Sequence, residues 1–266
     1  MSLLAIISLC LYTCVAVWSG REWLSGEPQA RQSALLNVLA WLAIVFHGIA
    51  VFQAIFTEGG MLLGFFPTAN LIAWLIVFTA QLSSLKMPIL RLLPPMYVLA
   101  ALNLVVYLIV PEQGTLYPNF ETGLSIHILS SILAYSIITL AAGQACALYL
   151  QDHALKARKV TGLIEWLPPL QTMEQLLFQM VGAGLLLLTL SIASGAFFLE
   201  DIFAQHLVHK TVFTLCAWLI FATLLWGRFQ MGWRGNTAIR WTLTGFAALM
   251  LAYFGSKFVL ELILGR

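Results

Sequence analysis

Long apolar runs separated by short polar stretches dominate the hydrophobic pattern of this chain. Most runs hold about 20 residues or more, the length that an α-helix needs to cross a hydrocarbon core of about 30 Å. A helix is suited to that environment because it satisfies its own backbone polar groups. We therefore predict about eight transmembrane helices, at residues 2–19, 34–56, 68–85, 94–110, 123–150, 174–199, 210–226 and 239–262.

Composition agrees with this pattern. Hydrophobic residues make up 61% of the 266 residues and charged residues only 9%, whereas a soluble domain carries about 25% charged residues. A water-soluble fold could not cover its surface with so little charge, and no extended soluble surface is left to bind nucleic acid. We expect an all-α polytopic membrane helix bundle that forms a single integral membrane domain over residues 1–266, with the lipid bilayer as its surroundings.

The distribution of lysine and arginine predicts an orientation. Ten of the 13 lie in the first, third, fifth and seventh loops, whereas the even-numbered loops hold only Lys210. The remaining two, Lys257 and Arg266, lie in the last helix and the tail. Cytoplasmic loops carry the excess of positive charge, so both termini are expected on the periplasmic side of a bacterial inner membrane.

Histidines are the candidates for chemistry. His127, near the start of helix 123–150, and His206 and His209, around the start of helix 210–226, fall at the outer surface in this orientation. His47 lies near the middle of the second helix, and His153 in a cytoplasmic loop, where we expect a solvated side chain.

Imidazole chemistry leaves two interpretations open. A facing pair of imidazoles could hold a flat cofactor, because histidine is the usual axial ligand of heme iron. Alternatively, a histidine near the membrane interface can simply hydrogen-bond a carbonyl group or water. Spacing alone does not separate these readings.

Other functional classes find little support. Acidic residues are nearly absent from the predicted spans, which counts against a coupled transporter. The four cysteines form no Cys-x-x-Cys pair, and the chain has no phosphate loop, nucleophile elbow or convincing acid–base pair. The sequence therefore reveals no enzymatic reaction of its own.

Three segments carry a family resemblance: GFFPTANL at 64–71, LSIHILSSILAY at 124–135, and LPPLQTME at 167–174 with LSIASG at 190–195 and the stretch onward to Lys210. In order and spacing they resemble the CcsA-type cytochrome c assembly family, which handles heme in membranes, and within it the YpjD branch. The resemblance covers roughly residues 40–256.

This resemblance implies a heme site at the outer face. The histidine of the second segment is an outer-face heme ligand in the family, which carries that role to His127. The sequence departs from the family at several positions. Phe65 and Trp226 replace family histidines, the final outer histidine of the family is absent, and the stretch QHLVHK at 205–210 lacks the family's tryptophans and aspartate. A second ligand would have to be supplied locally, by His209 or His206.

The leading hypothesis is therefore a heme-handling membrane protein related to cytochrome c assembly. Heme b would lie between helices 123–150 and 210–226, with His127 and His209 as ligands of its iron, Lys210 near its propionates and His47 as a further cofactor-binding candidate. Other cytochrome-assembly or membrane proteins are the expected partners besides heme. The alternatives are a scaffold or regulatory partner of a membrane complex that binds no heme and, with less support, a small-solute transporter.

Overall fold

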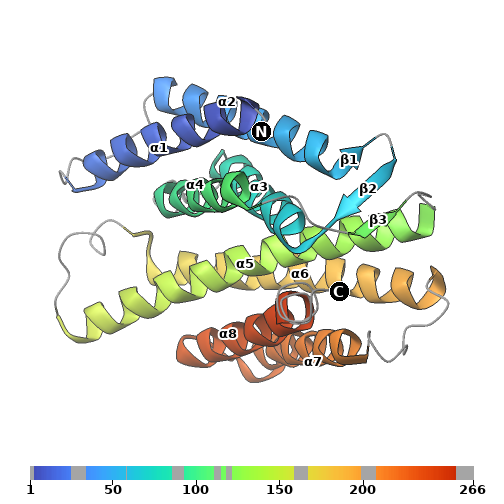
Figure 1. Cartoon of the computed structure of the whole chain (residues 1–266). Coiled ribbons are helices and arrows are strands. Elements are labelled where there is room, and N and C mark those ends of the chain that lie inside the picture. Colours follow the sequence, from blue (N-terminus) through green and yellow to red (C-terminus); the bar gives the residue numbers. More distant parts are fainter. Residues whose placement is uncertain are drawn as a thin grey trace. The chain divides into compact units, whose positions relative to one another are not determined.

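The described part of this computed structural model is almost entirely helical (Figure 1). It covers residues 3–24, 34–57, 59–85, 93–110, 115–117, 122–158, 167–198 and 208–255. Its α-helices are α1 (Leu3–Leu24), α2 (Ala34–Ile55), α3 (Phe65–Ser84), α4 (Leu93–Ile109), α5 (Thr122–Lys156), α6 (Leu170–Phe198), α7 (Val208–Met231) and α8 (Asn236–Met250), which a π-helical turn, η3 (Leu251–Gly255), extends. The all-α membrane bundle predicted from the sequence is confirmed.

Six of the described helices are long and apolar enough to cross a membrane: α1, α2, α3, α5, α6 and α7. Helix α4 is apolar but shorter, at 17 residues, and α8 has 15 residues before its π-helical turn. Large apolar side chains point outward from these helices; Leu186 and Phe197 are 75% and 85% exposed. Such side chains need lipid around them, which agrees with a membrane-spanning bundle.

The helices fall into two compact units. Unit 1 comprises Met1–Asn119 and Val160–Pro168, and unit 2 comprises Phe120–Lys159 and Pro169–Arg266. We describe each unit by itself. The single domain expected over residues 1–266 stays a prediction.

In unit 1, α1 packs against α2 and α4, and α3 packs against the same two helices. The α2–α3 contact depends on Gly48, because a Cβ atom there would lie 2.8 Å from the indole of Trp74. The Trp74 Nε1–H donates to the Ile44 carbonyl oxygen at 2.8 Å. A small antiparallel sheet follows α2, in the order β1 (Phe56–Thr57), β2 (Gly60–Leu63) and β3 (Thr115–Tyr117).

In unit 2, α5 and α6 form the most extensive helix pair. Helix α5 has 35 residues, a length of about 52 Å at about 1.5 Å per residue. The two helices approach closely at Gly184, where a Cβ atom would lie 2.5 Å from Ile138 Cγ1. Helix α8 packs on α5 and α7, and its Gly245 makes room for the Phe221 ring of α7. Small residues thus set the distance between helices, as expected where lipid provides no hydrophobic drive for association.

Gly184 offers a test of this packing. We expect Gly184→Val to lower the free energy of unfolding by about 1–3 kcal/mol, because the new side chain overpacks the α5–α6 contact. The matched control is Gly182→Val, since a Cβ atom at Gly182 meets nothing within 4 Å. Thermal unfolding in detergent, followed by circular dichroism, measures both variants, and equal stability of the two would contradict the α5–α6 contact.

Candidate functional site

His127 lies in the first turns of α5 and faces α6. Its Nδ1 atom is 2.8 Å from the backbone carbonyl oxygen of Ser191. A carbonyl oxygen can only accept a hydrogen bond, so Nδ1 carries the proton of this contact. In the neutral ring the lone pair then lies on Nε2, which makes no hydrogen bond to the residues that the structure describes. This is the tautomer that a metal ligand requires, with its other nitrogen held by a backbone acceptor.

Three serine hydroxyls surround this contact. Ser131 Oγ donates to the His127 carbonyl oxygen at 2.6 Å and lies 2.5 Å from Ser191 Oγ. Ser194 Oγ donates to the Ser191 carbonyl oxygen at 3.0 Å, so that oxygen accepts from both Ser194 and His127. These bonds tie α5 to α6 at the level of His127 and fix the direction of its ring.

The start of α7 brings a cation to the same region. The Lys210 ammonium lies within electrostatic range of the His127 ring. Its Nζ atom also lies 5.2 Å from the ring centroid of Tyr253, in cation–π geometry. Tyr253 packs on Tyr135 of α5 with ring centroids 5.7 Å apart. Parts of α5, α7 and η3 therefore meet at Tyr135, about two turns along α5 from His127.

Of the two proposed partner ligands, the structure describes the backbone of His209. The backbone of His209 belongs to the first turn of α7, directly before Lys210, but its side chain lies outside the described structure. His206 lies outside the described residues altogether. Their roles as heme ligands stay predictions.

His47 occupies a different environment, in unit 1. Its ring is fully buried, with Nδ1 3.3 Å from the Tyr12 hydroxyl and Nε2 3.0 Å from Asn70 Oδ1. Both nitrogens thus have hydrogen-bond partners, which links α1, α2 and α3 through one side chain. This arrangement gives His47 a structural role, and its place in a cofactor site stays a prediction.

The same unit holds a second buried polar group. The Tyr97 hydroxyl donates to Gln81 Oε1, and Gln81 Nε2 donates to Asn37 Oδ1 at 2.7 Å. The rings of Tyr97 and Tyr12 stack with centroids 6.1 Å apart. The side chains of this group are tyrosines and amides, which carry no formal charge at neutral pH. Paired polar groups of this kind join helices at membrane depth.

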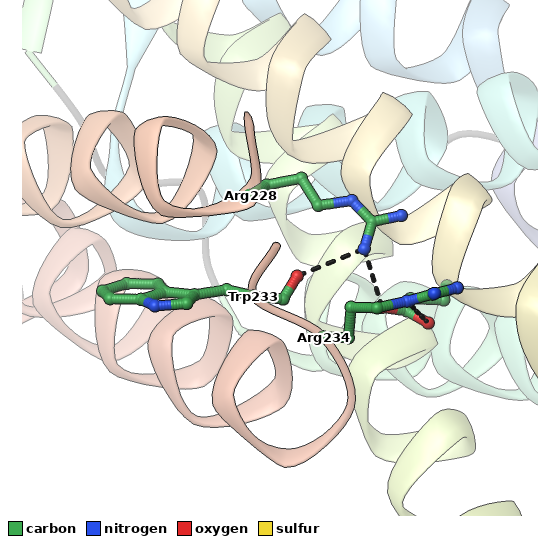
Figure 2. Close-up of polar contacts among 4 residues, drawn as sticks. Arg228, Trp233 and Arg234 are labelled. Carbon is green, nitrogen blue, oxygen red and sulfur yellow. Dashed lines mark hydrogen bonds and ion pairs between the residues drawn. The ribbon is translucent and has the colours of Figure 1, made fainter. Parts of the chain in front are cut away.

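A charged cluster joins α6, α7 and the loop between α7 and α8 at one end of unit 2 (Figure 2). The Glu174 side chain is only 5% exposed, and its Oε1 atom lies 3.2 Å from Arg228 Nη1 and 3.3 Å from Arg234 Nε. Arg228 also donates to the Trp233 carbonyl oxygen at 3.2 Å and lies over the Phe178 ring, 4.6 Å from its centroid. Two cations therefore neutralise one buried carboxylate and tie α6 to α7 and to the loop that follows α7.

Sequence reasoning found some of these residues and missed others. His127 and Lys210 were assigned to one heme site from the sequence, and that assignment stays a prediction. Asn70 and Glu174 stood within the family-like segments, but no role was assigned to either; the only signal was that each is a polar residue placed in or beside an apolar run. Arg234 was counted only as a loop charge.

Comparisons with known proteins support the resemblance. The profile of a family described as "Cytochrome C assembly protein" matches residues 35–264. The chain is 29% identical to "Inner membrane protein YpjD" of Escherichia coli (strain K12), over 99% of this chain and 100% of that protein. It is 27% identical to "Cytochrome c biogenesis protein CcsA" of Gloeobacter violaceus over 34% of this chain and 28% of that protein. No solved structure shows significant similarity to the chain.

The charged cluster leads to a stability prediction. Glu174→Ala leaves two guanidinium groups without their buried anion, and we expect it to cost about 3 kcal/mol of unfolding free energy, the lower end of the range for a broken buried pair. Asp152→Ala is the control, because it removes the carboxylate of an exposed pair with Lys156 and should cost less than about 1 kcal/mol. Titration with sodium dodecyl sulfate in mixed micelles measures both; a smaller loss for Glu174→Ala than for the control would contradict the prediction.

Proposed function

The chain belongs to the cytochrome c assembly protein family, and on this basis we propose that it is a heme-handling protein. The proposal places heme b at the outer face of the membrane, between α5 and α7, with His127 as an axial ligand. It also places the protein in the bacterial inner membrane with both termini on the periplasmic side. The name of the E. coli relative, which matches over its whole length, supports the inner-membrane location. The distribution of positive charge among the loops supports the orientation.

The single observation that carries this proposal is the state of the His127 ring. Its Nδ1–H is held by the Ser191 carbonyl oxygen at 2.8 Å, which leaves Nε2 as the nitrogen able to bind iron. A second-shell acceptor of this kind orients a ligating imidazole and raises its basicity. The His127 side chain is partly exposed, so a cofactor could reach Nε2 without unfolding α5.

The second axial ligand is proposed to come from the start of α7. Lys210 interacts electrostatically with His127, and His209 directly precedes Lys210 in the same helical turn. Neighbouring Cα atoms are about 3.8 Å apart, so the backbone of His209 lies next to that of Lys210, whose charge acts on His127. His206, three residues earlier, is the alternative ligand.

The remaining groups of the site fit a non-covalently held heme. The chain has no Cys-x-x-Cys pair for thioether attachment, which favours a b-type heme. The Lys210 ammonium, already in contact with the Tyr253 ring, supplies positive charge for a propionate. Heme would supply the redox and transfer chemistry, whereas the protein would bind and orient it. Partners among other cytochrome-assembly proteins would then receive or supply that heme.

Removal of the ligand tests the proposal directly. The purified protein supplied with heme should show a Soret band, and His127→Ala should lower heme occupancy at least about tenfold, since even second-shell changes cost metal sites 10–100-fold. His153→Ala is the matched control, because His153 is an exposed histidine near the far end of the same helix and should leave the band unchanged.

Absence of a Soret band in the wild-type protein, or an unchanged band in His127→Ala, would overturn the heme assignment. Stable co-purification with a membrane complex and no chromophore would instead favour the alternative function, a scaffold or regulatory partner without heme.

Lys210 should have a smaller effect than His127. We expect Lys210→Gln to weaken heme retention by up to about fivefold, because a partly exposed ion pair contributes about 1 kcal/mol or less. Competition for bound heme by apomyoglobin measures the change. A complete loss of heme in a folded Lys210→Gln variant would show that this lysine is more than a propionate contact.

A further inference from the structure

The end of unit 2 that holds the charged cluster carries more positive than negative charge. Glu174 contributes one carboxylate, whereas Arg228 and Arg234 contribute two guanidinium groups. Arg240, in the second turn of α8, is also exposed. Among the described residues, no second carboxylate pairs with these arginines.

Arg234 engages Glu174 with one edge of its guanidinium group only. Its Nε atom lies 3.3 Å and 3.4 Å from the two carboxylate oxygens, and its two Nη amino groups make no hydrogen bond to the part of the chain that the structure describes. The Arg234 side chain is 55% exposed. The four N–H donors of its Nη groups therefore make no hydrogen bond to the carboxylate, and their planar arrangement suits a phosphate group.

The loop around Arg234 is held in place rather than free. Gly232 and Gly235 flank the loop with positive φ angles of 67° and 53°. The Trp233 amide donates to the Gly227 carbonyl oxygen at 3.1 Å, and the Trp233 ring packs on Trp241 with centroids 5.2 Å apart. The guanidinium group is thus presented from a fixed backbone, which lowers the entropy cost of binding an anion.

The surroundings favour a lipid over a soluble anion. Phe229 and Met231, in the last turn of α7, are 80% and 57% exposed, so apolar surface adjoins the cation in the sequence. Trp226 is a further exposed aromatic residue one turn earlier. Tryptophans and arginines at the end of an apolar helix are typical of the headgroup level of a bilayer.

We propose that Arg234, held by Glu174, binds the phosphate of an anionic phospholipid headgroup. The charges of Arg228 and Arg240 add to the positive potential of this end of unit 2. The acyl chains of this lipid would lie along the apolar end of α7. This site is independent of the proposed heme site and lies on another part of unit 2.

Native mass spectrometry of the delipidated full-length protein in neutral detergent tests the proposal, with phosphatidylglycerol and phosphatidylcholine as probes. The wild-type protein should retain phosphatidylglycerol preferentially, and this preference should fall as salt is raised. Arg234→Gln should reduce the preference about fivefold. Lys156→Gln, which removes a cation from an exposed pair on α5, is the matched control and should keep it.

Arg234→Lys keeps the positive charge but loses the planar guanidinium group, so it should retain part of the preference for phosphatidylglycerol. This variant also serves as the test if Arg234→Gln does not fold. Equal retention of both lipids by the wild-type protein, or equal preference in wild type and folded Arg234→Gln, would overturn the proposal. A third arm uses inorganic phosphate alone: if it displaces phosphatidylglycerol at equal concentration, the site recognises a free anion and the lipid assignment fails.

Discussion

The hydrogen bond from His127 to the Ser191 carbonyl oxygen depends on how closely α5 and α6 approach each other. Gly184 permits that approach, since a side chain there would collide with Ile138. The same contact aligns Ser131 with Ser191 at 2.5 Å and, further along, lets Gln144 donate to the Met173 carbonyl oxygen at 3.0 Å. One helix pair thus provides both the rigidity of unit 2 and the orientation of its candidate ligand.

Hydropathy predicts helices well here because the bilayer sets a length that each apolar run must reach. It says much less about which helix faces meet. The partners of Glu174 lie 54 and 60 residues away in the sequence, and those of His47 lie 35 residues before it and 23 after it. A helical period identifies a buried side of one helix but does not pair it with another. The family resemblance identified His127, whereas its acceptor is a backbone atom and leaves no trace in the sequence.

The two units limit the free-energy cost of burying polar groups in different ways. Unit 1 uses neutral side chains, with His47 satisfied by Tyr12 and Asn70, so no formal charge has to be desolvated. Unit 2 places a charge, Glu174, near helix ends, where Arg228 and Arg234 can pair with it and still reach water. The depth of each group in its helices accounts for the choice, because an unpaired charge is most expensive at the centre of the bilayer.

That the acceptor for His127 belongs to the peptide chain has an evolutionary consequence. Exchange of Ser191 for alanine would remove the hydroxyl that meets Ser131 but would leave the carbonyl oxygen that holds the imidazole. Only a change in the path of α6, such as a proline one turn later that disturbs the local backbone bonding, would move the oxygen. The acceptor of the imidazole is therefore inherited with the course of the α6 backbone rather than with the chemical identity of one side chain.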